Sequence, residues 1–264
     1  MSITFYKYHG TGNDFILIDD RNELFPVENT DYVRRLCERR FGIGADGLML
    51  LRNKQGYDFE MIYFNSDGKI GSMCGNGGRC IVAFAYETGA VKKRDMVFDA
   101  PDGRHEASIS ESGEVSLKMN DTGEVQKRGD DFILDTGSPH CVRFTTDDLT
   151  DAALMKAVEE VRLSDDYRRE GINVNLVNDK KPGELIIRTY ERGVENETFS
   201  CGTGVTAAAI CAGFKSGTSG AAEYVIRAKG GKLKVNYLLN NGKAQNVCLI
   251  GAAAFVFKGE LPNA

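Results

Sequence analysis

The sequence predicts an α/β protein built from two similar halves, and three observations support this prediction. Two Cys-Gly-x-Gly tracts, at Cys74 and Cys201, each run directly into an Ala-rich apolar segment. Short apolar or alternating runs bounded by Gly, Asn and Asp surround both tracts, which is typical of β-strands. The motifs on either side of the two cysteines recur in the same order, which indicates a duplicated domain.

Each half is expected to consist of strands around one main helix. The strand pattern appears at residues 15–18, 47–51, 59–64, 96–98, 173–177 and 184–190. The segments after the two cysteines, residues 78–87 and 205–214, are apolar on nearly every side, as expected for a helix enclosed by its own sheet. Two more helices are expected at residues 30–40 and 149–161, where Asp or Thr can cap a periodic run.

The duplication depends on an ordered set of matches around the two thiols. Thr11-Gly12-Asn13 aligns with Thr136-Gly137-Ser138, Phe64-Asn65 aligns with Glu191-Arg192, and Ala100-Pro101-Asp102-Gly103 aligns with Ala228-Lys229-Gly230-Gly231. One shared glycine tract would be ordinary, whereas several matches in order indicate two copies of one domain.

Composition and charge exclude several classes of protein. The chain has 264 residues and a formal net charge of −5, which argues against an electrostatic nucleic-acid binder. No apolar stretch is long enough for a transmembrane helix and no signal segment is evident, so we expect a soluble, cytoplasmic protein. The seven cysteines are odd in number and lack Cys-x-x-Cys spacing, so neither a disulfide framework nor a metal site is expected.

The tract Gly42-Ile43-Gly44-Ala45-Asp46-Gly47 matches the G-x-G-x-x-G pattern of dinucleotide-binding folds. It follows an expected helix and precedes an expected strand, whereas a dinucleotide site needs the reverse order. Nicotinamide binding is therefore not expected.

Two thiols at helix starts suggest proton transfer at carbon. The positive end of a helix favours a thiolate, and its free N–H groups can hold a carboxylate. The backbone N–H groups of Gly75, Asn76, Gly202 and Thr203 could stabilise the enolate-like charge that grows when the adjacent carbon loses a proton. One thiolate would remove that proton and the opposite thiol would return one, which inverts the carbon without a cofactor.

Several motifs together closely resemble the signatures of the diaminopimelate epimerase family. They are His9-Gly10-Thr11-Gly12-Asn13-Asp14-Phe15, Phe64-Asn65-Ser66-Asp67-Gly68, Met73-Cys74-Gly75-Asn76-Gly77-Gly78-Arg79-Cys80, Pro139-His140-Cys141-Val142, Tyr190-Glu191-Arg192-Gly193 and Ser200-Cys201-Gly202-Thr203-Gly204. The resemblance implies two pseudo-symmetric domains, each a mostly antiparallel sheet or barrel around a central helix, with the active site in the cleft between them. We place the first domain at residues 1–119 with 249–264 and the second at residues 120–248.

The resemblance also implies an activity and a set of site residues. The activity is the cofactor-independent interconversion of LL- and meso-2,6-diaminopimelate, on the route to lysine and peptidoglycan precursors, by a homodimer. Cys74 would act on the LL isomer and Cys201 on the meso isomer. The distal end of the substrate would be bound by Asn13, Asn65, Asn173 and Arg192. The reacting carboxylate would lie at Gly75, Asn76, Gly202 and Thr203. Glu191 would pair with an ammonium group, and Glu191 and His140 would orient the thiols.

Two departures from the family pattern and three alternatives accompany this interpretation. Ser138 stands where many members have Asn, which removes one amide contact, and Asn196 stands where Gly is common. A racemase of proline, hydroxyproline or histidine would share the two-thiol logic, although proline racemase-like proteins typically carry His where Asn76 stands. The remaining alternatives are a redox protein with a Cys74–Cys201 disulfide and a non-catalytic binder of amino-acid-like ligands. Oxidation that joins the two thiols is expected to inactivate the enzyme.

Overall fold

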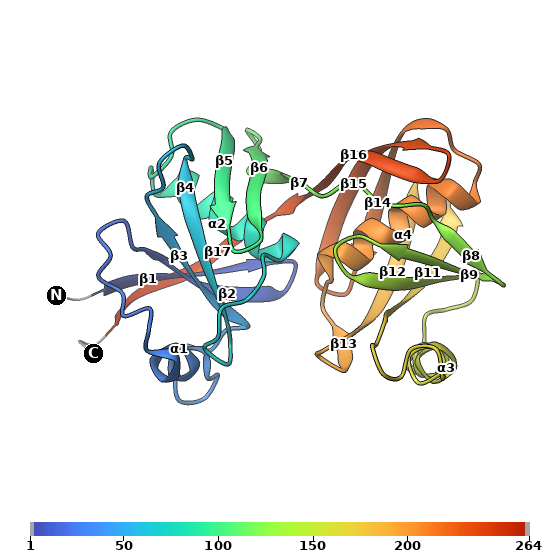
Figure 1. Cartoon of the computed structure of the whole chain (residues 1–264), viewed down its shortest axis with the longest axis horizontal. Coiled ribbons are helices and arrows are strands. Elements are labelled where there is room, and N and C mark those ends of the chain that lie inside the picture. The colour runs from blue at the N-terminus through green and yellow to red at the C-terminus, as the bar shows by residue number, and fades with distance from the viewer. Residues whose placement is uncertain (1–2, 262–264) are drawn as a thin grey trace. The chain divides into compact units, whose positions relative to one another are not determined.

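The computed structural model describes residues 3–261 of the chain. It divides into two compact units, one formed by residues 1–117 and 251–264 and the other by residues 118–250 (Figure 1). Each unit is a sheet with one helix enclosed by it and one further helix. The fold is therefore the mixed α/β class that the sequence predicts.

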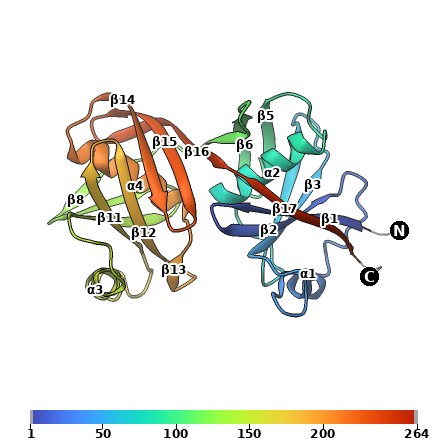
Figure 2. The ribbon, with the colours of Figure 1, turned by 180° about the vertical axis from the view of Figure 1, so that it is seen from behind.

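The first unit contains the first seven strands, the last strand and two helices. In chain order they are β1 (Ile3–Gly10), β2 (Asn13–Asp19), α1 (Thr30–Cys37), β3 (Gly47–Arg52), β4 (Phe59–Asn65), α2 (Gly75–Glu87), β5 (Asp95–Ala100), β6 (Gly103–Ile109), β7 (Glu114–Lys118) and β17 (Ala254–Leu261). Strand β17 returns from the far end of the chain and pairs antiparallel with β1, as Figure 2 shows from behind.

The second unit carries the remaining elements. They are β8 (Gln126–Arg128), β9 (Asp131–Asp135), β10 (Pro139–Thr145), α3 (Asp151–Val161), β11 (Asn173–Lys181), β12 (Glu184–Glu191), β13 (Asn196–Thr198), α4 (Gly202–Lys215), β14 (Gly220–Ala228), β15 (Gly231–Asn240) and β16 (Lys243–Ala252). Helices α1 and α3 occupy equivalent places, each between two strands that pair in parallel.

The two units repeat one pattern of strand pairing. In the first unit β2–β3 is parallel, β3–β4 antiparallel, β4–β5 parallel and β5–β6 antiparallel. In the second unit β10–β11, β11–β12, β12–β14 and β14–β15 follow the same alternation. The duplication seen in the motifs is therefore a duplication of topology.

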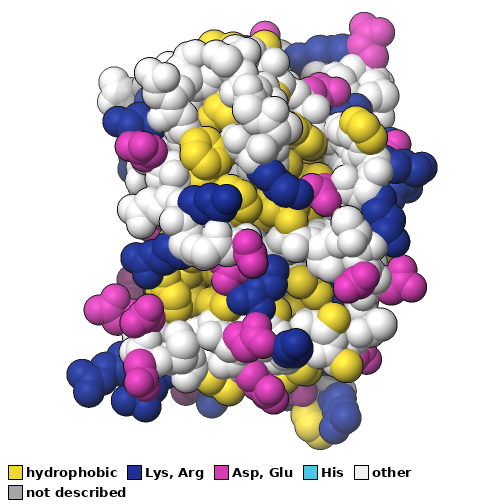
Figure 3. Space-filling view, turned by 90° about the vertical axis from the view of Figure 1, so that its right-hand side faces the viewer, with side chains coloured by type: hydrophobic (Ala, Val, Ile, Leu, Met, Phe, Trp, Pro, Cys, Tyr) yellow, Lys and Arg dark blue, Asp and Glu magenta, His cyan; other side chains and the backbone are white. Residues whose placement is uncertain are grey.

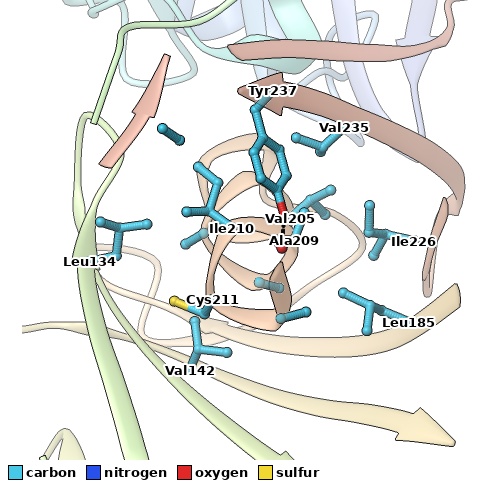
Figure 4. Close-up of a cluster of buried hydrophobic side chains, with 14 of the residues drawn as sticks. Leu134, Val142, Leu185, Val205, Ala209, Ile210, Cys211, Ile226, Val235 and Tyr237 are labelled. Atoms are coloured by element: carbon cyan, nitrogen blue, oxygen red, sulfur yellow. Dashed lines mark hydrogen bonds between the residues drawn. The ribbon is translucent and has the colours of Figure 1, made fainter. Parts of the chain in front are cut away.

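Helix α4 is the centre of the second unit's core. Its Ala-rich stretch is buried on all sides, and Val142, Leu185 and Val235 from surrounding strands pack against it (Figure 4). The Tyr237 hydroxyl donates a hydrogen bond to the Ala209 carbonyl over 2.7 Å, so this buried hydroxyl is satisfied. A Cβ atom at Gly213 would collide with the Tyr237 hydroxyl, so this turn of the helix has no room for a larger residue.

Several element boundaries differ from the sequence-based expectation. Helices α2 and α4 begin at Gly75 and Gly202, three residues earlier than expected, because the cysteines themselves are the N-cap residues. Helix α1 ends at Cys37 and not at residue 40, since Glu38 adopts an extended conformation. Charged residues in the segment 38–40 made the helical pattern look longer than it is.

The surface of the second unit carries charges of both signs. Figure 3 shows basic and acidic side chains interspersed on the face turned toward the viewer. Pairs such as Lys215–Asp179, at 2.6 Å, account for part of this mixture in the second unit. Within residues 3–261, no helix is long and apolar enough to cross a membrane.

Candidate functional site

The first cysteine of interest caps helix α2. Cys74 has the extended backbone of an N-cap residue, with φ −112° and ψ 146°, and its Sγ accepts a hydrogen bond from the Gly77 N–H at 3.2 Å. A sulfur in this place receives both a direct N–H donor and the positive end of the helix dipole. Both interactions favour the thiolate over the thiol.

Asn13 lies beside this thiol, directly after the turn between β1 and β2. Its Oδ1 accepts a hydrogen bond from the Cys74 thiol, with 3.8 Å between oxygen and Sγ, and another from Asn76 Nδ2 at 3.3 Å. Its Nδ2 donates to Asp46 Oδ2 at 2.5 Å, which fixes the direction of the amide. The structure therefore brings together three residues that the sequence analysis selected: Asn13, Cys74 and Asn76.

A buried arginine, Arg79, contacts the start of helix α2. Arg79 is fully buried, and its guanidinium donates to Gly75 O at 3.1 Å, to Asn76 Oδ1 at 3.0 Å and to Thr11 Oγ1 at 3.2 Å. These acceptors are neutral, and no described carboxylate forms an ion pair with Arg79. Burial lowers the pKa of this guanidinium, while the sulfurs of Cys80 and Cys74 oppose that shift.

An arginine remains charged in proteins, so this site holds a positive charge at the already positive end of a helix. Such an arrangement is unfavourable unless negative charge forms nearby. Cys80 is fully buried, and burial raises the pKa of its thiol, so it stays protonated. Cys74 is half-buried, and its sulfur interacts electrostatically with the Arg79 guanidinium.

Asn65 lies apart from this group. It is the last residue of β4, it is exposed, and its backbone forms a turn through the bonds Asn65 N–H to Lys69 O and Gly68 N–H to Asn65 O. No hydrogen bond between described side chains joins it to Asn13 or Cys74. Its role in substrate binding stays a prediction.

The second cysteine of interest occupies the N-cap position of helix α4. Cys201 has φ −108° and ψ 113°, and its side chain makes no capping hydrogen bond. Its Sγ lies instead 3.3 Å from Thr203 Oγ1. The two cysteines share a backbone position and differ in what contacts the sulfur.

A chain of hydrogen bonds extends from Cys201 into the core of the second unit. Thr203 Oγ1 lies 2.9 Å from His140 Nε2, and His140 Nδ1 lies 3.0 Å from Asn175 Nδ2. Complete burial, together with the nearby charge of Arg192, lowers the pKa of His140 to about 3. His140 is therefore neutral at physiological pH, and it contacts the thiol through Thr203.

The remaining predicted residues of the second unit form a polar cluster around Asn173. The Asn173 Nδ2 donates to Ser138 Oγ at 2.9 Å, and its Oδ1 accepts the Arg192 backbone N–H at 2.8 Å. Arg192 Nη2 also donates to Ser138 Oγ, at 3.4 Å. Ser138 thus links Asn173 and Arg192 through its hydroxyl, and Glu191 precedes Arg192 at the end of β12.

Sequence reasoning missed two residues of the hydrogen-bond networks at these helix starts: Arg79 in α2 and Asn175 in β11. The sequence places Arg79 within a cysteine motif and Asn175 within a strand, and it predicts no site role for either. The alternation Asn173-Val174-Asn175 was the available signal for Asn175, because two polar residues two apart on a strand share one face. No group of three metal-binding side chains is found among the described residues.

Comparison with known proteins identifies the family. The sequence model of the family described as diaminopimelate epimerase matches residues 5–127 and 132–256. A protein named diaminopimelate epimerase from Flavobacterium psychrophilum is 48% identical over 253 residues, which cover 96% of this chain and 98% of the relative. Another protein of that name, from Chlorobaculum tepidum, is 38% identical, and the match covers 96% of this chain and 98% of the relative.

Solved structures with low sequence identity share the fold. A PhzF-family phenazine biosynthesis protein of Bacillus anthracis superposes with a TM-score of 0.74 at 11% identity, covering 100% of both chains. A hydroxyproline epimerase from Agrobacterium vitis has a TM-score of 0.67 at 13% identity, covering 98% of this chain and 92% of that one. The chain belongs to the diaminopimelate epimerase family and is an isomerase of the epimerase type.

Proposed function

We propose that this protein interconverts LL- and meso-2,6-diaminopimelate, with Cys74 and Cys201 as the two acid/base residues. The observation that carries the proposal is the equivalent placement of the two cysteines. Each is the N-cap of the enclosed helix in a unit of the same topology. The match of 48% identity to a protein named diaminopimelate epimerase supports the choice of substrate.

The proposed reaction begins with the substrate's α-carboxylate at the helix N-termini. Backbone N–H groups of Gly75, Asn76, Gly202 and Thr203 would stabilise the negative charge that moves onto the carboxylate when the α-proton leaves. Cys74 as thiolate would take the proton of the LL isomer, and Cys201 as thiol would give a proton to the other face. The reverse reaction exchanges the two roles. A two-base inversion requires that both sulfurs reach one α-carbon.

The other end of the substrate carries a second carboxylate and a second ammonium group. We propose that Asn13, Asn65, Asn173 and Arg192 bind this distal end and that Glu191 pairs with an ammonium group. The Asn173–Ser138–Arg192 cluster supports this part of the proposal, because it holds a guanidinium and an amide side by side. Ser138 supplies a hydroxyl where an amide is common.

The wider setting of the activity is also proposed. We assign the enzyme to the cytoplasmic synthesis of lysine and peptidoglycan precursors, as a homodimer that uses no cofactor. The proposed catalytic domains are residues 1–119 with 249–264 and residues 120–248. Their boundaries lie within two residues of those of the compact units.

Deuterium exchange tests the function directly. The reduced protein is incubated with LL-2,6-diaminopimelate in heavy water, and NMR follows deuterium at one α-carbon and the appearance of the meso isomer. We expect both signals to rise together, since inversion by two bases replaces the α-proton with one from solvent. Absence of exchange under reducing conditions rules out the proposed activity.

Parallel incubations with proline, trans-4-hydroxyproline and histidine serve as the specificity control. Exchange with one of these and not with diaminopimelate would keep the two-thiol chemistry and change the substrate. An absorbance spectrum of the same sample tests the cofactor-free mechanism, because a Schiff-base cofactor would absorb at visible or near-visible wavelengths.

A further inference from the structure

Asn175 is fully buried at the inner end of the hydrogen-bond chain that leads to Cys201. Its Nδ2 lies 3.0 Å from the Cys141 backbone carbonyl, and its Oδ1 lies 2.9 Å from Thr189 Oγ1. A carbonyl oxygen can only accept a hydrogen bond, so the atom that faces Cys141 must be the NH₂ group. The orientation of the Asn175 amide is therefore determined by its surroundings.

The orientation of this amide determines the tautomer of His140. The second N–H of Asn175 Nδ2 points to His140 Nδ1, at 3.0 Å. A nitrogen that receives a donor must have its lone pair free, so Nδ1 carries no proton. A neutral imidazole then carries its single proton on Nε2. The ring is neutral because it is completely buried, with a pKa of about 3.

The tautomer in turn determines the direction of the Thr203 hydroxyl. His140 Nε2–H donates to Thr203 Oγ1 at 2.9 Å, so the hydroxyl proton cannot point toward the ring. The next acceptor is the Cys201 Sγ, 3.3 Å away. The Thr136 hydroxyl donates to the Thr203 carbonyl at 2.9 Å and holds that residue in place.

We propose that Asn175 is a positioning residue for Cys201, because it locks His140 in the Nε2–H tautomer and so directs the Thr203 hydroxyl proton to the Cys201 sulfur. This inference rests on the proposed acid/base role of Cys201. A hydroxyl donor stabilises the thiolate, and when Cys201 is protonated its S–H proton is free to point away from Thr203. No proton is transferred along the chain; the chain sets directions only.

Gly204 indicates how closely this network is packed. A Cβ atom at this position would lie 2.5 Å from Asn175 Oδ1 and 3.3 Å from His140 Cε1. A side chain there would displace the amide or the ring. The glycine of the second Cys-Gly-x-Gly tract thus leaves room for the network as well as for the helix start.

The first experiment reads the tautomer in the unmodified enzyme. Full-length protein labelled with ¹⁵N-histidine is studied by NMR, and the His140 signals are assigned by their loss in His140→Gln. We expect the proton on Nε2 and a lone pair on Nδ1, without change between pH 6 and pH 8. A proton on Nδ1 overturns the proposal, whatever the activity of the enzyme.

The second experiment replaces the Asn175 amide that determines the tautomer of His140. In Asn175→Asp a carboxylate replaces the NH₂ group and can only accept, so it favours a proton on His140 Nδ1. The Thr203 hydroxyl would then turn to Nε2 and no longer donate to the Cys201 sulfur. We expect kcat/KM to fall by about ten- to a hundredfold, the contribution of one hydrogen bond to a charged group. The fall should be equal in both directions, because an enzyme cannot alter the equilibrium between the isomers.

Asn178→Asp is the matched control. Asn178 lies on the same strand, is buried, and donates through Nδ2 to the Asp147 carbonyl at 2.8 Å, outside the network. The Asn178→Asp variant should lose stability as Asn175→Asp does, and it should keep the wild-type kcat/KM. Equal losses of activity in the two variants would show a merely structural effect and contradict the proposal.

The alkylation of Cys201 separates this inference from the proposed function. Iodoacetamide is applied without substrate across a pH series, and peptide mapping gives the rate at Cys201. We expect Asn175→Asp to slow alkylation at pH 7 by about tenfold and Asn178→Asp to leave it unchanged. An unchanged rate in Asn175→Asp overturns the inference even if the enzyme epimerises diaminopimelate. A slowed rate in a protein without epimerase activity refutes the proposed function instead.

Discussion

The starts of α2 and α4 have the same backbone role and different polar surroundings. At α2 the Cys74 sulfur accepts the Gly77 N–H, and the buried charge of Arg79 lies beneath it. At α4 the Cys201 side chain makes no capping hydrogen bond; its sulfur contacts the Thr203 hydroxyl, which in turn contacts the neutral His140 and, through it, the Asn175 amide. Cys74 thus lies close to a buried positive charge, whereas Cys201 lies at the end of a chain of neutral hydrogen-bonding groups.

This difference teaches that duplication preserved the position of the thiol and not its electrostatics. Two identical thiols would have the same affinity for a proton, whereas an epimerase needs one acid and one base in each direction. The buried cation favours the thiolate form at Cys74. We therefore expect Cys74 to be the thiolate and Cys201 the protonated partner when the LL isomer binds.

The largest effect is expected from removal of either thiol. Cys74→Ala and Cys201→Ala should each lower net epimerisation by about 10²- to 10⁴-fold, since each variant lacks one of the two acid/base groups. The conversion of each isomer is followed by NMR or by a coupled assay. If one variant keeps its rate within tenfold of the wild type, the two-base assignment is wrong.

The next effect concerns the buried cation. Arg79→Met should slow the alkylation of Cys74 at pH 7 by about tenfold or more, because the thiolate loses a neighbouring positive charge. Cys201, measured by peptide mapping in the same sample, should change less. Arg79→Lys is the matched variant, which keeps the charge with fewer donors and should recover part of the rate. Equal slowing at both cysteines would show that the Arg79 charge does not stabilise the Cys74 thiolate more than the Cys201 thiolate.

A smaller effect is expected from the third residue after each cysteine. In Gly204→Ala the new Cβ would lie 2.5 Å from Asn175 Oδ1, and in Gly77→Ala it would lie 3.3 Å from Met49 Sδ. Met49 can adjust at its flexible end, whereas Asn175 is held by its own hydrogen bonds. We expect Gly204→Ala to cost about 1–3 kcal/mol of unfolding free energy and Gly77→Ala about 1 kcal/mol or less. Chemical denaturation of both variants checks the order, and a reversed order would contradict the packing described.

The smallest effect is the pH dependence contributed by His140. Its pKa is about 3 in the folded protein, against an ordinary value of 6.5. Between these values the unfolded chain binds a proton that the folded chain does not, so stability falls as pH falls, by about 1.4 kcal/mol per pH unit. Urea unfolding followed by circular dichroism at pH 7 and pH 5 should show this slope in the wild type and a shallower one in His140→Gln. Parallel slopes would mean that His140 titrates normally. No such contribution is expected at the α2 start, where Arg79 stays charged.

The elements that the sequence predicted well are those with strong local patterns. Buried strands such as β3, with the sequence Gly-Leu-Met-Leu-Leu-Arg, and the Ala-rich helices α2 and α4 were all expected. Strands with polar or exposed residues were not assigned, and β6 and β17 are examples. Strand β6 contains Arg104, His105 and Glu106, and β17 is largely exposed. Their pairing with distant strands, and not their own composition, makes them strands.

The site shows the same division between local and distant information. The positions of Cys74 and Cys201 as helix caps follow from a few neighbouring residues, because capping is a local interaction. The bond from Asn13 to Asp46 depends on how the β1–β2 turn meets the segment before β3. The end of α1 was misjudged by three residues because the charged segment after it carries no strong stop signal.

By itself, the sequence determined that there are two halves, that each contains an apolar helix, and that a cysteine begins each helix. These properties are encoded in periodicity, glycine placement and repetition, which act over short stretches of chain. Only the tertiary structure decided what lies beside each thiol. The parallel register of β10 with β11 places Val142 opposite Asn175 and brings His140 within hydrogen-bond distance of the Asn175 amide. The hydrogen bond from Arg79 to Thr11 joins residues that are 68 positions apart in the sequence. Hydrogen bonds between distant residues depend on strand register and burial, and no local pattern specifies them.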